Sequence, residues 1–398
     1  MTRRDASWLR FGSAALGVGV FLVSWALLHE GFYARDQIVD TPIYERYGEA
    51  MVDGRVPYRD FTVEYPPAAL PVFLLPALGA GDSNDYRRRF EGLMAGLGVA
   101  CVLLVAVLSS SFWAPLFVGA APLLLGSVYL SRFDLWPAAL TLVALALLAS
   151  GRSRLGLGAL GVAVAAKLYP AVLAPIAVAH VWRTRGRREA LIGTGIFVGV
   201  VAAIVLPFAV VSPGGVWDGF WRQADRPLQI ESLGAGLLLA AHHLFGLGVT
   251  MESSHGSQNL TGGGADALAA VSTLLQAAAL VAVWILYARG PATRERLLLA
   301  CAAALCTFVA FGKVLSPQFL IWLVPVVPLV WGRRGLVASG VLAAALVATQ
   351  LWFPYRYWEL ALEFDEPASW LVLVRDVLLV GLTLLLVAGA RPGRARSP

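Results

Sequence analysis

The sequence predicts an all-α polytopic membrane protein, and three observations support this prediction. Of the 398 residues, 58% are hydrophobic and only 14% are charged, whereas an ordinary globular domain has roughly a quarter charged residues. Mean hydropathy is +0.72. Apolar runs recur along the whole chain, and about 20 such residues suffice to cross a bilayer. This composition excludes soluble enzymes, DNA-binding modules and disordered scaffolds, and we treat 1–398 as a single integral membrane domain.

The first apolar run covers residues 11–28 and follows three arginines, an order that resembles a secretory signal peptide. No small-residue cleavage site follows it, because Trp25 and His29 stand where one would be expected. We therefore expect a retained first membrane helix whose N-terminal end is cytoplasmic, since basic residues flank spans on that side.

Further apolar runs and arginine-rich loops alternate after the first helix. The runs lie at 66–80, 92–109, 113–130, 133–150, 155–182, 190–211, 264–287, 297–315, 317–331, 335–353 and 369–389. The positive-inside rule predicts cytoplasmic positions for the basic loops between them. These loops are Arg87–Arg89, Arg152–Arg154, Arg183–Arg188, Arg289–Arg296, Arg333–Arg334 and the basic tail 391–398.

This arrangement requires two of the runs to be re-entrant pairs of half-helices. They are 113–130, broken by Pro122, and 155–182, broken by Pro170; such breaks are tolerated where a segment lines a protein cavity. The chain then has about ten full spans with both termini cytoplasmic. The segments expected outside are 29–66, 212–263 and 354–368.

The outer loop 29–66 is expected to contain a surface helix. Thr41 is the predicted cap and Pro42 the first helical residue, and Gly54 ends the pattern. Apolar side chains at helical spacing predict an amphipathic helix on the membrane surface: Ile43, Tyr47, Ala50 and Met51.

Asp36 and Asp40 stand four residues apart just beyond the first span. A carboxylate at the rim of an outer cavity suits general-base catalysis, because it can take the proton from a hydroxyl nucleophile. The structural alternative is that Asp40 supports the helix start through the helix dipole and that Asp36 is solvated.

Charged residues also lie beside or within apolar runs. Arg132 and Asp134 either neutralise each other at the membrane interface or face a substrate cavity. Lys167 and Lys313 are the two lysines in a chain with 31 basic residues, and each lies close to a proline within an apolar run. They either bind the phosphate of an anionic substrate together with Arg132 or extend to the interface as solvated side chains.

Signals for cofactors are weak. The outer histidines and glutamate show no HxxxH or HExxH spacing, and the cysteines lie in apolar runs without metal-type spacing, as small core residues do. These residues are His242, His243, His255, Glu252, Cys101, Cys301 and Cys306. We expect no metal, ATP or NAD cofactor and no nucleic-acid partner, and metal dependence stays open.

Four motifs occur in a specific order along residues 10–335. They are Asp40-x3-Tyr44 with Gly54, Tyr58 and Glu64–Tyr65–Pro66–Pro67; Arg132–Phe133–Asp134 with Trp136–Pro137; Lys167–Leu168–Tyr169–Pro170; and Gly312–Lys313–Val314–Leu315–Ser316–Pro317–Gln318–Phe319. Together they resemble the glycosyltransferase family 87 mannosyltransferases. They are also similar to the first mannosyltransferase of GPI-anchor synthesis.

The resemblance implies a GT-C fold and an inverting enzyme. Such an enzyme transfers a sugar, usually mannose, from a polyprenyl-phosphate donor to a lipid or glycan acceptor on the extracytoplasmic side of the cell membrane. It implies that Asp40 is the catalytic base and that Asp134 is a second acidic position. The expected substrate-binding residues are Asp36, Tyr44, Tyr58, Glu64, Arg132, Asp134, Lys167, Lys313 and Gln318.

Two other functional classes compete with the enzyme. A transporter or flippase for a lipid-linked sugar also uses broken helices and buried lysines, and a non-catalytic assembly subunit would keep the same fold. The sequence shows no inverted repeat, and the long loop 29–66 with its carboxylates exceeds what a permeation path needs. Both features favour the enzyme.

Overall fold

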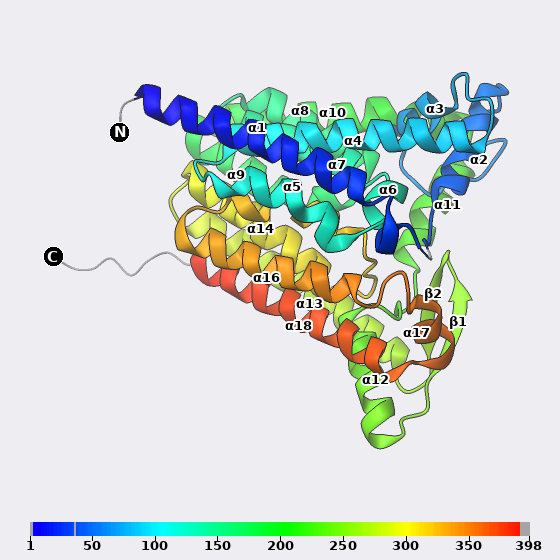
Figure 1. Ribbon diagram of the computed structural model, residues 1–398. Helices are drawn as coiled ribbons and strands as arrows, with labels where there is room; N and C mark the ends of the chain where they lie inside the picture. The colour runs from blue at the N-terminus through cyan, green and yellow to red at the C-terminus, as the bar shows by residue number, and fades with distance from the viewer. Residues whose placement is uncertain (1–2, 36, 391–398) are drawn as a thin grey trace.

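The computed structural model describes residues 3–35 and 37–390. Asp36 and the basic tail 391–398 lie outside the described residues. Within them the protein is a bundle of helices with one small β-hairpin (Figure 1). The predicted all-α membrane fold class is therefore confirmed.

Five of the described helices are long and apolar enough, by length and composition, to cross a membrane. These are α1 (Arg3–Leu27), α4 (Ser83–Leu108), α10 (Arg187–Val211), α13 (Ala265–Arg289) and α18 (Glu366–Ala390). Shorter helices make the other passes through the bundle: α5 (Trp113–Leu125), α7 (Leu135–Ala149), α8 (Ser153–Ala166), α9 (Ala174–Arg185), α14 (Arg294–Ala310), α15 (Phe319–Leu323) with the 3-10 turn η4 (Val327–Leu329), and α16 (Gly332–Gln350).

The bundle has two ends, which we call the terminal end and the loop end. Helix α1 begins and α18 ends at the terminal end (Figure 1). The loop end carries the short elements η1 (Gly31–Ala34), α2 (Thr41–Val52), α11 (Pro213–Ala224), α12 (Leu233–Phe245), β1 (Thr250–Ser254), β2 (Ser257–Thr261) and α17 (Tyr357–Glu363). The described parts of the segments 29–66, 212–263 and 354–368 thus lie together at one end, and the prediction that this end faces outward stays a prediction.

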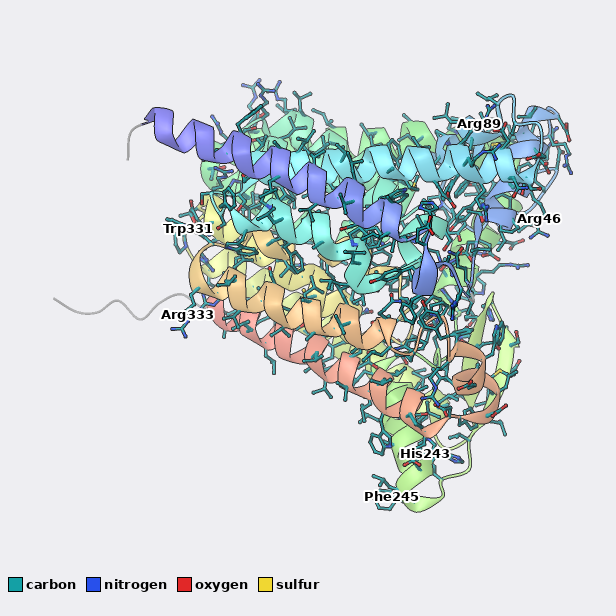
Figure 2. All side chains as sticks on the ribbon, viewed as in Figure 1. Arg46, Arg89, His243, Phe245, Trp331 and Arg333 are labelled. Carbon is teal, nitrogen blue, oxygen red and sulfur yellow. The ribbon has the colours of Figure 1, made fainter. Side chains whose placement is uncertain are left out.

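The path between residues 66 and 109 differs from the prediction. Run 66–80 was expected to cross, but it forms only the 3-10 turn η2 (Pro67–Ala69) and α3 (Leu70–Ala77). Eight helical residues span about 12 Å, far less than a bilayer. The chain turns back, and the guanidinium of Arg89 donates to the carbonyls of Leu78 and Gly79 at 2.7 and 2.8 Å. Arg89 therefore lies at the loop end, as Arg46 of α2 does (Figure 2).

The arginines at 87–89 lie at the loop end, where the positive-inside rule did not place them. Arg88 and Arg89 pair with Asp85, and Arg87 pairs with Glu91. The rule counts basic residues and gives acidic partners little weight, so a single cluster can depart from it while most of the basic loops follow it. Helix α4 then runs to the terminal end.

Segment 113–130 was predicted as a re-entrant pair of half-helices. It instead passes through the bundle once, which compensates for the pass that α3 fails to make. Helix α5 is continuous, with Pro122 inside it, and ends at Gly126, whose φ is 76°; the short α6 (Val128–Ser131) follows. Proline removes one helix hydrogen bond, which neighbouring helices in a membrane bundle tolerate. The hydroxyl of Tyr33, just beyond α1, donates to the carbonyl of Leu123 at 3.0 Å, so α5 takes the chain to the loop end.

Segment 155–182 forms the predicted re-entrant pair. Helix α8 ends before Lys167, whose backbone is extended (φ −159°, ψ 143°). The 3-10 turn η3 (Tyr169–Leu173) reverses the chain, and α9 returns. Arg185, at the end of α9, donates to the carbonyl of Gly151 at 3.3 Å, so both helices meet the terminal end and Lys167 lies at the apex between them.

The start of α2 differs by one residue from the prediction. Asp40, not Thr41, occupies the N-cap position, and its side chain makes no capping hydrogen bond. The Asp40 carboxylate therefore supports the helix start through the helix dipole and not through a capping hydrogen bond, so the structural alternative and a catalytic role both stay open at this position.

Candidate functional site

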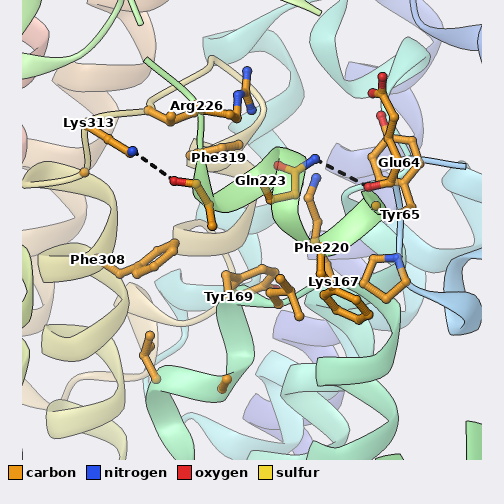
Figure 3. Close-up of a pocket in the computed structure, with 18 of the residues that line it drawn as sticks. Glu64, Tyr65, Lys167, Tyr169, Phe220, Gln223, Arg226, Phe308, Lys313 and Phe319 are labelled. Atoms are coloured by element: carbon orange, nitrogen blue, oxygen red, sulfur yellow. Dashed lines mark hydrogen bonds between the residues drawn. The ribbon is translucent and has the colours of Figure 1, made fainter. Parts of the chain in front are cut away.

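A cavity of about 580 Å³ lies between the apex of the α8–α9 hairpin, α11, α13 and the loop joining α14 to α15 (Figure 3). Its wall is largely apolar and includes the aromatic rings of Tyr65, Tyr169, Phe220, Phe308 and Phe319. This volume and lining are typical of a site for a small molecule or a lipid headgroup.

Charged side chains are few in this wall. Lys167, Arg226 and Lys313 contribute positive charges, and Glu64 contributes a carboxylate. A largely apolar cavity with a cationic part suits a ligand that has an apolar portion and an anionic group.

Lys167 is paired inside the protein. Its Nζ donates to Asp134 Oδ1 at 2.6 Å, and the indole Nε1 of Trp322 donates to the same oxygen at 2.5 Å. The ammonium also lies 4.6 Å from the ring centroid of Phe133, within cation–π range. Asp134 is 1% exposed, so Lys167 does not extend to the membrane interface.

Lys313 and Arg226 have no directly bonded counter-charge: Asp225 lies near Lys313 and Glu231 near Arg226, but among the described residues neither cation forms an ion pair within 4 Å of a carboxylate. Lys313 Nζ donates to the carbonyl of Ala224 at the end of α11, at 3.0 Å. The Nε of Arg226 is buried without a hydrogen-bond partner in the described part of the chain, and burial lowers the pKa of its guanidinium.

Arg226 was not identified from the sequence. It stands between a surface helix and Pro227, in a segment expected to lie outside the membrane. Basic residues are less frequent in short loops on that side. The sequence signal that could have identified Arg226 is an arginine in such an outer segment, directly before a proline that restricts the chain.

Asp40 lies beside a second ion pair. The guanidinium of Arg132 pairs with the Asp40 carboxylate and donates to the carbonyl of Ile38 at 3.4 Å. The hydroxyl of Tyr44 donates to Asp40 Oδ2 at 3.3 Å. The Asp40 side chain remains 24% exposed, so one part of the carboxylate is accessible.

The two ion pairs are joined through one short segment. Arg132 and Asp134 do not neutralise each other: Arg132 pairs with Asp40, and Asp134 pairs with Lys167. Asp40 does not line the cavity, whereas Lys167 does. Residues 132–134 therefore connect the exposed carboxylate to the cavity.

The other predicted binding residues fall into two groups. Tyr58 and Glu64 line the cavity, and the Tyr58 hydroxyl donates to the carbonyl of Tyr65 at 2.5 Å. Tyr44 and Gln318 do not line it: the Tyr44 ring stacks on Phe73 at 4.6 Å within the core, and Gln318 is half-buried at the start of α15. Asp36 lies outside the described residues.

The possible metal ligands do not come together. Among the described residues, no group of three His, Cys, Asp or Glu side chains is placed to hold a metal ion. The cysteines Cys101, Cys301 and Cys306 are buried and free.

These features define a polytopic membrane protein with a cationic, aromatic cavity that residues 132–134 connect to a half-buried aspartate. Residues 61–317 match the model of glycosyltransferase family 87. Because the match covers well over half of the chain, the protein belongs to this family and is a membrane glycosyltransferase, which confirms the resemblance seen in the motifs. A comparison with curated proteins gives no match.

The matched residues include Arg132, Asp134, Lys167, Arg226 and Lys313. Asp40 and all of α18 lie outside them. The role proposed for Asp40 therefore depends on its geometry and its sequence motif, and the role proposed for α18 depends on geometry alone.

Proposed function

We propose that the protein transfers a sugar from a polyprenyl-phosphate donor to a lipid or glycan acceptor. The resemblance to mannosyltransferases favours mannose as that sugar. The cavity is the observation that carries this proposal. A polyprenyl chain is apolar and its phosphate is anionic, and the cavity offers aromatic walls with Lys313 and Arg226 on one side and Lys167 on another. A flippase would need a similar cavity, so the chemistry of Asp40 separates the two functions.

Arg226 and Lys313 would hold the donor phosphate. Hydrogen bonds between cations and phosphate oxygens are stronger than neutral ones, and they stabilise the negative charge that grows on the phosphate as it leaves. Both side chains lack a carboxylate partner among the described residues, so donor binding need not break an existing ion pair.

Asp40 would act as the general base. It takes the proton of the acceptor hydroxyl while that oxygen bonds to the anomeric carbon, and the bond from this carbon to the phosphate oxygen breaks with its electrons. A single displacement inverts the sugar without a covalent intermediate. Arg132 and Tyr44, which both contact the carboxylate, orient it for this step.

The loop end would face the extracytoplasmic side of the cell membrane. The arginines of 152–154, 183–188, 289–296 and 333–334 gather toward the terminal end, as shown by Arg333 in Figure 2 and by the hydrogen bonds that join Arg183 to Gly290 and Arg296 to Ala390. Basic residues favour the cytoplasmic side. Donor, acceptor and Asp40 would then meet outside.

The direct test is transfer by the purified protein. It is incubated with polyprenyl-phosphate mannose and a panel of lipid acceptors, and the product mass is measured. Asp40→Asn should express and bind donor nearly normally but lose about a hundred- to ten-thousand-fold in transfer rate, because asparagine lacks the basic oxygen.

Asp53→Asn is the matched control, since Asp53 is an exposed aspartate at the other end of the same helix. It should transfer at the normal rate. Full transfer by Asp40→Asn, or movement of the donor lipid across a bilayer without any transfer, would contradict the proposal.

A further inference from the structure

Helix α18 carries an ion pair that the proposed reaction does not use. Arg375 and Asp376 are both 0% exposed, and Arg375 Nε lies 2.7 Å from Asp376 Oδ1. Charges within a membrane helix are costly and usually serve a function. Both residues lie outside the stretch that matches the family model and away from the cavity wall.

Arg375 contacts the segment that follows Arg226. Its Nη2 donates to the main-chain carbonyl of Glu231, a residue that is itself 2% exposed. The side-chain amide of Gln229 donates to the Glu231 carboxylate. The pair on α18 thus fixes the backbone of residues 229–231 from one side.

Gln229 continues the connection to the loop that carries Lys313. Its main-chain N–H donates to the carbonyl of Lys313 at 3.0 Å, and its side-chain amide donates to the hydroxyl of Ser316 at 2.7 Å. A continuous set of contacts therefore runs from Asp376 through Arg375, the 229–231 segment and Gln229 to the loop 312–316.

The linked segments carry the two unpaired cations of the cavity. Arg226 stands three residues before Gln229, and Lys313 accepts the Gln229 hydrogen bond on its own carbonyl. Strand β2 holds the other side of the same segment, because Ile230 N donates to the Gln258 carbonyl at 3.0 Å and Leu260 N donates to the Leu228 carbonyl at 2.9 Å. Residues 228–231 are thereby clamped between α18, β2 and the Lys313 loop.

We propose that Arg375 and Asp376 are positioning residues that hold Arg226 and Lys313 together at the cavity. Arg375 provides the hydrogen bond to the Glu231 carbonyl, and Asp376 supplies the counter-charge without which a buried guanidinium is strongly unfavourable. The effect on donor use rests on the proposed function. The clamp itself does not.

The first experiment measures the clamp without any substrate. The double variant Arg375→Gln/Asp376→Asn removes both charges of the pair together, so neither residue is left as an unpaired ion on α18 and the protein should fold. Amide hydrogen exchange in residues 229–232, whose N–H groups donate to the carbonyls of Lys313, Gln258 and Gln229, should become roughly tenfold faster, the change expected for loss of about one hydrogen bond's free energy.

Thr383→Ala is the matched control for this helix. Thr383 is buried on α18, and its hydroxyl bonds only within the helix, to the Leu379 carbonyl at 2.9 Å. This variant loses part of a buried side chain but no link to the 229–231 segment, so exchange in residues 229–232 should match that of the unaltered protein.

The second experiment measures donor use. In the double variant the KM for the polyprenyl-phosphate sugar should rise roughly tenfold while kcat changes less than about twofold. Gln229→Leu should raise KM by a similar factor, and adding it to the double variant should raise KM little further, because both changes break the same connection.

Unchanged exchange in residues 229–232 of the folded double variant would overturn the proposal whatever the sugar donor is. Faster exchange with an unchanged KM would also overturn it. So would a KM in the combined variant that rises by the full product of the two separate increases, because the two changes would then act independently. Faster exchange in a protein that never transfers sugar from polyprenyl-phosphate would support the clamp and contradict the proposed function instead.

Discussion

Arg226 and Lys313 differ from Lys167 in the partners that the fold gives them. Lys167 already has the buried carboxylate of Asp134, whereas Lys313 bonds to a carbonyl oxygen and the Nε of Arg226 lacks a partner among the described residues. A phosphate entering the cavity gains most from cations that are not already neutralised. The donor phosphate is therefore expected at Arg226 and Lys313, and Lys167 is expected to fix the cavity wall.

Replacing either unpaired cation should weaken donor use. Arg226→Gln and Lys313→Gln should each raise the donor KM by about ten- to a hundredfold, since a charge-assisted hydrogen bond contributes about 1.5–3 kcal/mol. Steady-state kinetics with polyprenyl-phosphate mannose measures this change. Arg222→Gln, at an exposed arginine that does not line the cavity, serves as the control. Unchanged KM in both glutamine variants would place the phosphate elsewhere.

Glu231 should make the stability of the protein depend on pH. It lies in the loop between α11 and α12, where burial raises the pKa of its carboxyl from the ordinary 4.5 to about 7, although Arg375 and Arg132 oppose the shift. The folded protein thus holds this proton more tightly than the unfolded chain. The stabilisation is fully present below pH 4.5 and is lost as pH rises through about 7.

Glu231→Gln should remove this dependence. Between pH 5 and pH 8 the melting temperature of the unaltered protein should fall relative to that of the variant, since glutamine stays neutral throughout. Thermal unfolding in detergent at several pH values measures the difference. Glu252→Gln, at an exposed carboxylate on β1, should parallel the unaltered protein. Parallel curves for Glu231→Gln would contradict the prediction, because they would show that folding does not change the proton binding of Glu231 between pH 5 and pH 8.

At the scale of elements, the sequence predicts apolar segments better than it predicts their paths. The hairpin at 155–182 was predictable because Lys167 and Pro170 interrupt one long run. The crossing by 113–130 was not, because a single proline inside a helix does not show whether the chain turns there. Hydropathy also could not show that 66–80 returns to its own side.

The same limit applies to the site. Residues that stand in ordered motifs, such as Asp40 and Lys167, were identified from the sequence. Arg226 and Arg375 were not, because their significance comes from contacts between distant segments: Arg375 and Glu231 are 144 positions apart. No local spacing encodes such a contact.

The packing of α2 on α3 should be necessary for placing Asp40. Gly48 of α2 is buried, and a Cβ there would meet the carbonyl oxygen of Phe73 and the side chain of Ala77. Gly48→Ala must therefore move α2 away from α3, which disturbs the Asp40–Arg132 pair at the start of the helix. We expect roughly tenfold slower transfer and lower stability, because overpacking costs about 1–3 kcal/mol.

Gly96→Ala on α4 provides the control, since nothing lies within 4 Å of a Cβ at that position. It should leave transfer unchanged and raise stability slightly, by up to about 1 kcal/mol, through better helix propensity. Transfer rates and thermal unfolding of both variants test this. A Gly48→Ala protein with normal transfer would show that α2 can move without displacing Asp40.

At the scale of the whole molecule, the two ends of the bundle should face opposite sides of the membrane. Basic loops gather at the terminal end, while α2, α11 and the hairpin occupy the loop end (Figure 1). Even so, Arg87–Arg89 lie at the loop end with their own acidic partners. The orientation is therefore predicted from the majority of the basic loops, which lie at the terminal end, and not from one cluster.

Single cysteines at exposed positions test this orientation. Ser83→Cys and Glu252→Cys mark the loop end and Thr184→Cys marks the terminal end, in a background with Ala at Cys101, Cys301 and Cys306. An impermeant thiol reagent added to intact cells should label the first two positions and leave Thr184→Cys unlabelled until the membrane is opened. Ser83→Cys tests whether residues 66–80 cross the membrane. If they did, Ser83→Cys would be protected while Glu252→Cys stayed accessible. Labelling of Ser83→Cys and Glu252→Cys together would show that α3 turns back, and labelling of Thr184→Cys alone would reverse the orientation and place Asp40 in the cytoplasm.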